Sequence, residues 1–243
     1  MEEEDLIKEA ERALHELEKK RARKGHVEKI EEPPKEKGNP FAYLLVLVII
    51  LLIILMAVPY YGIKLDPEPK SIPKPSEVMP YHVKLLANET ATMEIEDRND
   101  ILKMIVSDHQ SIRNMAVRIV TSSCRSSEIC YAKALFYFVR DNFQYVGDPG
   151  NEYYESPFET LYSGGADCDG LAILLANLES AIGIPTRFAF IPGHVYVQVK
   201  IDGAPRKYRE EDDWISLDPS CSGCEFGEVP YSTLNKRKDY LYI

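Results

Sequence analysis

The sequence predicts a mixed α+β domain that follows a single membrane-spanning helix. Three observations support this fold class: an uninterrupted apolar run around residue 50, apolar residues at helical spacing in three later segments, and alternating apolar and polar residues in two short segments. Helices and half-buried strands are therefore expected on the C-terminal side of the membrane segment.

Residues 41–58, FAYLLVLVIILLIILMAV, are eighteen apolar residues in a row, and no charged residue occurs between Lys37 and Lys64. This run is long enough to cross a bilayer. A cleaved signal peptide has an apolar stretch of roughly 7–15 residues near the N-terminus, whereas forty residues precede this one. A buried core helix is disfavoured because the run has no polar face. An uncleaved, single-pass helix over residues 41–63 is predicted.

The flanking cations predict the orientation of this helix. Six Lys or Arg residues lie in residues 21–40, but only three lie in residues 64–83. Because cytoplasmic flanks carry the excess of positive charge, the N-terminus is expected in the cytoplasm and the C-terminal domain outside it, at the cell membrane.

The chain on either side of the helix divides into three further parts. Residues 1–40 are a charged helix and linker, with apolar residues at helical spacing over residues 2–24; a solvated helix and a partner-docking helix both fit. Residues 64–80 are rich in proline and predict an extended stalk. Residues 81–243 form the domain. Asn88-Glu89-Thr90 in this part is a glycosylation sequon.

Composition excludes several classes of protein. The chain has 243 residues, of which 45% are hydrophobic, and a net charge of −10. The apolar fraction excludes disorder over the whole length. The acidic balance excludes nucleic acid as the main partner, because affinity for phosphate backbones comes mainly from Lys and Arg.

Two segments of the domain predict scaffold helices. In residues 99–121 a core-facing stripe recurs with a period of 3.6, and in residues 127–143 another stripe follows Ser127, a suitable N-cap. The stripes consist of Ile101, Met104, Ile105, Ile112, Met115, Ala116 and Ile119 in the first segment, and of Ala132, Leu135, Phe136, Val139 and Phe143 in the second.

Five cysteines divide into two close pairs and a single residue. The simplest pairing is Cys124 with Cys130 and Cys221 with Cys224, although cross-pairing is equally allowed. Structural disulfides are favoured in an exterior compartment. Two alternatives stay open: zinc bound by the same four thiols, and redox chemistry at Cys221-Ser222-Gly223-Cys224. In the favoured arrangement Cys168 is free.

Cys168 stands where a nucleophilic thiol is expected. It follows Gly164-Gly165-Ala166-Asp167 and opens a segment with a helical apolar stripe that ends at Gly183. Asp167 can cap this helix, and the free amides and positive end of the helix stabilise a thiolate. A buried structural cysteine would not require two glycines before it.

Two later residues complete a reactive constellation. His194 begins a strand in which Val195, Val197 and Val199 share one face, and Asp218 ends the strand that starts at Trp214. If these strands are antiparallel neighbours, Asp218 can reach His194. The carboxylate would then hold the imidazole in the tautomer that accepts the thiol proton.

With these residues the chain resembles the transglutaminase-like superfamily, whose members have a papain-like core. The likeness covers about residues 128–220, through YFVRDNFQYVGDP (137–149), ETLYSGGADCDGLAILLANLESAIGIPTRF (159–188), GHVYVQV (193–199) and WISLDPS (214–220). Membrane-anchored archaeal members are similar, down to the Cys-x-x-Cys after the aspartate. Tyr196 departs from the tryptophan that is frequent in the family.

The resemblance implies N-terminal helices packed on an antiparallel sheet, and a catalytic triad of Cys168 as nucleophile, His194 as base and Asp218 as orienting carboxylate. It implies attack on the amide or peptide bond of a protein or peptide substrate, with a thioester intermediate and no cofactor. Hydrolysis, as in a cysteine peptidase or amidase, is favoured over cross-linking. The alternative is a catalytically silent module of the same fold that binds peptides or scaffolds the cell envelope.

Overall fold

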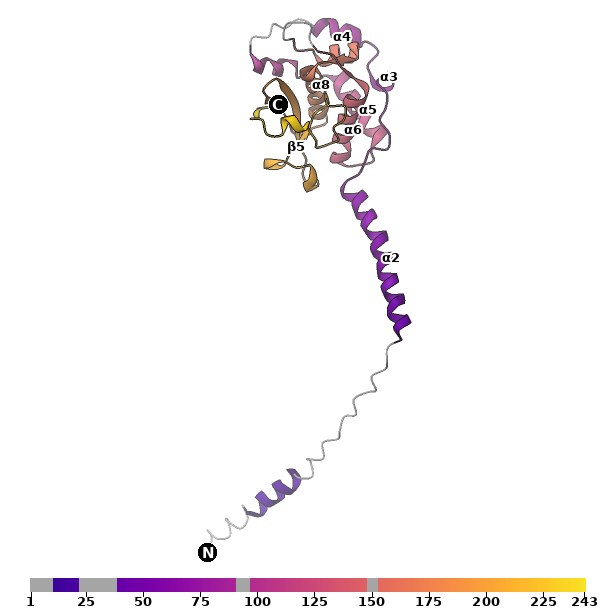
Figure 1. Ribbon diagram of the computed structural model, residues 1–243, viewed down its shortest axis with the longest axis vertical. Coiled ribbons are helices and arrows are strands. Elements are labelled where there is room, and N and C mark those ends of the chain that lie inside the picture. Colours follow the sequence, from indigo (N-terminus) through magenta and orange to yellow (C-terminus); the bar gives the residue numbers. More distant parts are fainter. Residues whose placement is uncertain (1–10, 22–38, 91–96, 148–152) are drawn as a thin grey trace. The chain divides into compact units, whose positions relative to one another are not determined.

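The computed structural model describes residues 11–21, 39–90, 97–147 and 153–243 (Figure 1). The chain divides into two compact units, Met1–Ile53 and Ile54–Ile243. In the first unit, residues 11–21 are helical with exposed side chains, within the helix expected over residues 2–24. The remaining residues of that expected helix, 2–10 and 22–24, lie outside the described residues.

Helix α2 (Pro40–Leu65) contains the apolar run. Among the described residues it is the one helix that is long and apolar enough to cross a membrane, over Pro40–Val58, and none of this stretch is buried. At about 1.5 Å per residue the stretch is roughly 28 Å long, close to the ~30 Å hydrocarbon core of a bilayer.

The second unit holds the predicted helices and strands. Its α-helices are α3 (Pro75–Val78), α4 (Val83–Thr90), α5 (Gln110–Ser123), α6 (Glu128–Asn142), α7 (Pro157–Ser163) and α8 (Cys168–Ala181), with short 3-10 helices η1 (Arg98–Met104), η2 (Arg206–Tyr208), η3 (Glu211–Asp213) and η4 (Tyr231–Thr233). Asn88, the sequon asparagine, is exposed on α4; its glycosylation stays a prediction.

The strands form an antiparallel sheet and a separate pair. The sheet has the order β5-β4-β3-β6, and the strands β1 and β2 pair in parallel. Their bounds are β1 (Gln144–Tyr145), β2 (Gly165–Ala166), β3 (Thr186–Ile191), β4 (His194–Lys200), β5 (Trp214–Leu217) and β6 (Asp239–Tyr242). Helices packed on an antiparallel sheet confirm the predicted α+β class.

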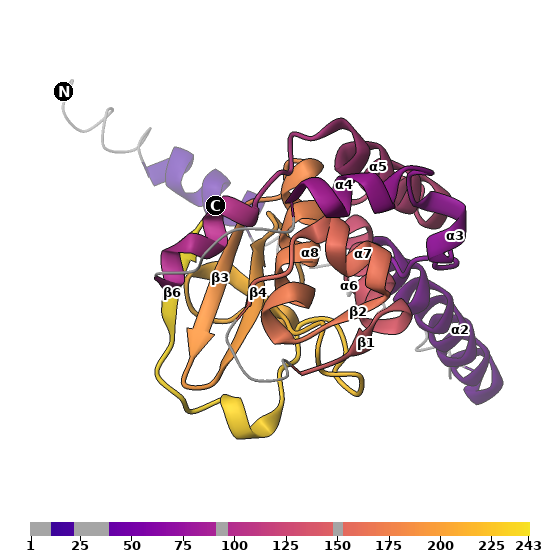
Figure 2. The same ribbon diagram turned by 90° about the horizontal axis from the view of Figure 1, so that it is seen from above.

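Helix α8 lies at the centre of this unit, with the sheet on one side and α5, α6 and α7 on the others (Figure 2). Its leucines 171, 174, 175 and 178 are at most 1% exposed. Val195, Val197 and Val199 of β4 belong to the same core. The expected apolar stripe is therefore part of a helix that is buried nearly all round.

Strand β4 differs from the half-buried strand that its alternation predicts, because both of its faces are covered. Tyr196 and Gln198, on the face opposite the valines, are 0% exposed. Gln198 accepts a hydrogen bond from Arg187 Nε at 2.8 Å and donates one to Ser216 Oγ at 2.9 Å. Buried, hydrogen-bonded polar side chains of β3, β4 and β5 therefore line the second face of the sheet.

The helix expected over residues 99–121 is broken in two, into η1 and α5. The amide of Asn177 on α8 accepts a hydrogen bond from Val106 N–H at 2.7 Å and donates one to the Met104 carbonyl at 3.0 Å. His109 then caps α5, since its Nδ1 accepts from Ser111 N–H at 3.1 Å. These side chains satisfy backbone groups that a continuous helix would have paired. The second expected helix, over 127–143, is confirmed as α6.

The proline-rich segment 64–80 is not a free spacer, which corrects the expected stalk. Lys133 of α6, whose side chain is 0% exposed, pairs with Asp66 at 2.5 Å and also with Glu68. Lys70 N–H donates to the Ser123 carbonyl at 2.9 Å. Val78 in α3 is buried. The segment packs on the domain because it supplies the anions that a buried ammonium requires.

We expect Asp66→Asn to lower the free energy of unfolding by roughly 3 kcal/mol, because removal of one partner leaves a buried charge poorly compensated. Chemical denaturation of the full chain in detergent measures this. Asp213→Asn is the control, since Asp213 pairs with Arg209 but its side chain is 62% exposed. Equal effects of the two substitutions would contradict the expectation.

Candidate functional site

Cys168 is the first residue of α8, and its thiol is partly exposed. Asp167 caps the helix: its Oδ1 accepts hydrogen bonds from Asp169 N–H at 3.0 Å and Gly170 N–H at 3.3 Å. This is the cap that the sequence predicts. The helix N-terminus favours negative charge on the sulfur.

Glycine is required at each of the two positions before this helix, for a different reason at each. Gly164 ends α7 in the left-handed conformation, with φ of 78°. At Gly165 a Cβ atom would lie 2.6 Å from the Gln144 carbonyl oxygen, because β2 runs directly beside β1. A side chain at the second position would push the two strands apart.

His194 lies between Cys168 and Asp218. Its Nε2 is 2.7 Å from Asp218 Oδ2, and the Cys168 thiol is close enough to contribute to the raised pKa of the ring. The antiparallel pairing of β4 with β5, with Val197 opposite Leu217, brings the start of β4 to the residue after β5. The structure therefore brings together all three residues that the sequence singles out.

Burial and neighbouring charge shift the pKa of His194 in opposite directions, and its side chain is 18% exposed. Burial lowers the pKa of the imidazole, but the hydrogen bonds and charges of Asp218 and Cys168 outweigh it and raise the pKa to about 9. Asp218 is 0% exposed. The arrangement therefore favours a protonated imidazole beside the sulfur at neutral pH.

Ser220 is a contact of the site that the sequence analysis did not find. Asp218 Oδ1 accepts hydrogen bonds from Ser220 N–H at 3.1 Å and from Ser220 Oγ at 2.7 Å. Asp-Pro-Ser is a turn sequence in which the aspartate side chain accepts a hydrogen bond from the backbone N–H two residues later. This local pattern could have predicted the contact between Ser220 and Asp218.

Three carboxylates, Glu155, Asp167 and Asp169, have oxygens within 4.8 Å of one another. Burial, followed by the hydrogen bond and charge of Asp167 and the charges of Cys168 and Glu155, raises the pKa of Asp169 to about 10. A proton on Asp169 relieves the repulsion. A hard divalent cation could do the same, because it prefers oxygen ligands. Glu155 was missed because it is far from Cys168 in sequence.

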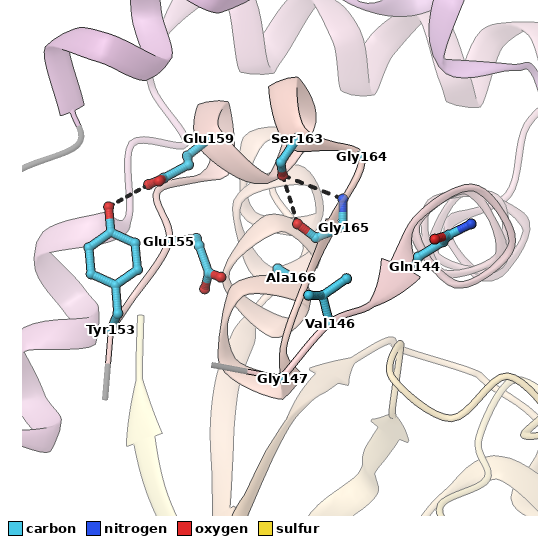
Figure 3. A pocket seen from close by; sticks show the side chains of 10 residues that line it. All are labelled: Gln144, Val146, Gly147, Tyr153, Glu155, Glu159, Ser163, Gly164, Gly165 and Ala166. Atoms are coloured by element: carbon cyan, nitrogen blue, oxygen red, sulfur yellow. Dashed lines mark hydrogen bonds between the residues drawn. The ribbon is translucent and has the colours of Figure 1, made fainter. Parts of the chain in front are cut away.

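A cavity of about 430 Å³ adjoins this cluster (Figure 3). It lies between the segment from Tyr153 to Glu159 and the strands β1 and β2, and the Glu155 carboxylate points toward it. Tyr153 Oη donates a hydrogen bond to Glu159 at 2.7 Å on one wall. Ala166, two residues before Cys168, belongs to the opposite wall.

The other four cysteines form disulfides with their sequence neighbours. Cys124 and Cys130 are joined with an S–S distance of 2.01 Å, and Cys221 and Cys224 with one of 1.97 Å. Cys168 is free. The alternative zinc site at these four residues is not formed, since a zinc ligand must be a free thiolate.

Comparisons with known proteins found one matching family and several solved structures of low similarity. The model of the Transglutaminase-like superfamily matches residues 113–219, a range that includes Cys168, His194 and Asp218. No curated protein matches the chain. Legionella pneumophila LapG is 16% identical, with a TM-score of 0.40, and the match covers 71% of this chain and 82% of LapG. A cysteine-protease candidate from Cytophaga hutchinsonii is 16% identical, with a TM-score of 0.37 and coverage of 63% and 60%.

Cys168 is expected to be the one free thiol of the five cysteines. Iodoacetamide should modify the denatured chain once without reductant and five times after reduction, as counted by mass spectrometry. The Cys168→Ala chain should take no label without reductant and four labels after reduction. A chain that takes more than one label without reductant would contradict the disulfide assignment.

The pairing of His194 with Asp218 should stabilise the fold in a defined pH window. The folded pKa of about 9 is above the ordinary value of 6.5, so this stability is fully present below about pH 6.5 and is lost as pH rises through about 9. The stability advantage of wild type over Asp218→Asn should therefore fall by roughly 1–3 kcal/mol across this window. Urea denaturation at several pH values measures it, and a pH-independent difference would contradict the pairing.

Proposed function

Because the model of the Transglutaminase-like superfamily matches residues 113–219, we propose that the protein is a cysteine-dependent hydrolase that acts on amide or peptide bonds of a protein or peptide substrate. One observation carries the proposal. A partly exposed thiol at a helix N-terminus lies beside an imidazole that is held by a buried carboxylate.

Each residue of this set has a role in the proposed mechanism. With Nε2 of His194 directed at Asp218, Nδ1 is the ring nitrogen left to take the Cys168 proton. The resulting thiolate attacks the substrate carbonyl carbon, and the C–N bond breaks as the imidazolium protonates the leaving amine. This gives a thioester and a free amine. Asp218 stabilises the imidazolium and fixes its orientation.

Water completes the cycle in the hydrolytic version of the reaction. His194 takes a proton from water, the hydroxide oxygen adds to the thioester carbonyl, and the C–S bond breaks to give a carboxylic acid and the Cys168 thiolate. A primary amine in place of water would give a cross-link. Hydrolysis is favoured because Cys168 and His194 are both partly exposed, so water reaches the thioester.

A membrane location is part of the proposal. Helix α2 has the length and apolar composition of a membrane span. Two disulfides fit an oxidising compartment. With more cations on the N-terminal flank than on the C-terminal one, the proposed orientation places the N-terminus in the cytoplasm and the hydrolase domain outside it.

An activated thiol is tested by the rate of Cys168 alkylation with iodoacetamide as a function of pH, on the full chain in detergent without reductant. Wild type should stay reactive well below the ordinary thiol pKa of about 8.5. His194→Ala should be at least about tenfold slower near pH 6, because its thiol is mostly protonated there. An ordinary thiol titration in wild type would refute the mechanism.

Turnover is tested with a mixture of unstructured peptides and a fluorescent primary amine, analysed by mass spectrometry. New peptide termini or conversion of glutamine to glutamate is expected in excess over amine incorporation. Cys168→Ala and His194→Ala should each reduce product by at least about a thousandfold while retaining the fold. Peptide binding without any product in wild type would instead favour a silent binding module.

A further inference from the structure

The buried carboxylate of Asp218 has two oxygens with separate partners. Oδ2 lies 2.7 Å from Nε2 of His194. Oδ1 accepts two hydrogen bonds from Ser220, one from the backbone N–H at 3.1 Å and one from the hydroxyl at 2.7 Å. We propose that Ser220 is a positioning residue that sets the plane of the Asp218 carboxylate, an inference that rests on the proposed function.

The geometry of aspartate explains why a second contact is needed. Rotation of the carboxylate about its last bond is broad and roughly two-fold, so one hydrogen bond to His194 leaves the plane poorly defined. Asp218 is 0% exposed, so bulk solvent does not fix it either. With Oδ1 held by the Ser220 hydroxyl, Oδ2 stays directed at the imidazole.

Ser220 is itself held in place by the loop that follows it. The next residue, Cys221, is bonded to Cys224, and Cys221 N–H donates to the Asp218 carbonyl at 3.2 Å. Arg140 on α6 donates to the Cys224 carbonyl at 2.6 Å. The disulfide and α6 therefore anchor the loop, and they hold the Ser220 hydroxyl against Asp218.

The surroundings of His194 make the inference measurable. The groups that face its ring are the Cys168 thiol on α8, the Asp218 carboxylate after β5 and the Tyr196 ring on β4, whose centroid is 6.2 Å away. Asp218 is the anion held directly against the imidazole. A change in the orientation of the Asp218 carboxylate should therefore be seen directly as a change in the pKa of His194.

The experiment compares wild type with Ser220→Ala, Ser220→Thr and Ser222→Ala in the full chain in detergent. Ser222→Ala is the matched control, because Ser222 lies in the same loop and is exposed. The first readout is the titration of the His194 ring by NMR, with His194→Ala used for assignment. The second is the rate of Cys168 alkylation by iodoacetamide. Thermal unfolding reports whether each variant is folded.

We expect Ser220→Ala to lower the His194 pKa and to slow alkylation near pH 6 by about 3- to 10-fold, the size of one lost hydrogen bond. Ser220→Thr keeps the hydroxyl and should restore both values, and Ser222→Ala should leave both unchanged. A merely structural serine would lower the unfolding temperature without moving the His194 titration.

Two results separate this inference from the proposed function. If folded Ser220→Ala has the wild-type His194 pKa and alkylation rate, Ser220 does not position Asp218 and the inference is overturned. If the His194 pKa falls in Ser220→Ala but wild-type Cys168 titrates as an ordinary thiol, the positioning role stands and the proposed thiol chemistry fails.

Discussion

Helix α8 is packed between the sheet and helices α5, α6 and α7, so it cannot shift without opening the core. The position of Cys168 depends on this constraint, because the thiol is on the first residue of the helix. Asn177, further along α8, also bonds the backbone at Met104 and Val106. One buried helix thus fixes both the candidate nucleophile and the path of the chain that precedes α5.

Charged groups inside the domain fall into two classes according to their partners. Lys133 and Asp218 are fully buried and have ionic or hydrogen-bonding partners, which allows them to carry charge. Glu179 is also fully buried, but neither of its carboxylate oxygens has a partner within the described chain. Burial raises the pKa of Glu179 well above its ordinary value, which favours the neutral form of this side chain. Because desolvation penalises a buried charge without a partner, buried charges are found where partners exist. These places are the candidate site, at Asp218, and the contact of Lys133 with the segment after α2.

Much of the domain was predictable because local patterns reflect burial. The stripes of α6 and α8, the cap at Asp167 and the position of strand β4 all follow from side chains close in sequence. Predictions failed where distant residues intervened. Asn177 interrupts the expected helix over 99–121, and Lys133 draws the segment with Asp66 onto the domain. Such contacts have no local signature, because each joins residues that are more than sixty positions apart.

By itself, the sequence determined the α+β class, the apolar helix, and the residue types and order of Cys168, His194 and Asp218, since periodicity, helix capping and residue chemistry are local properties. Only the tertiary structure decided that β4 and β5 are antiparallel neighbours, that the cysteines pair with their nearest partners and that Glu155 joins the acidic residues beside Cys168. Those outcomes depend on which buried surfaces pack together, and packing is a property of the whole chain.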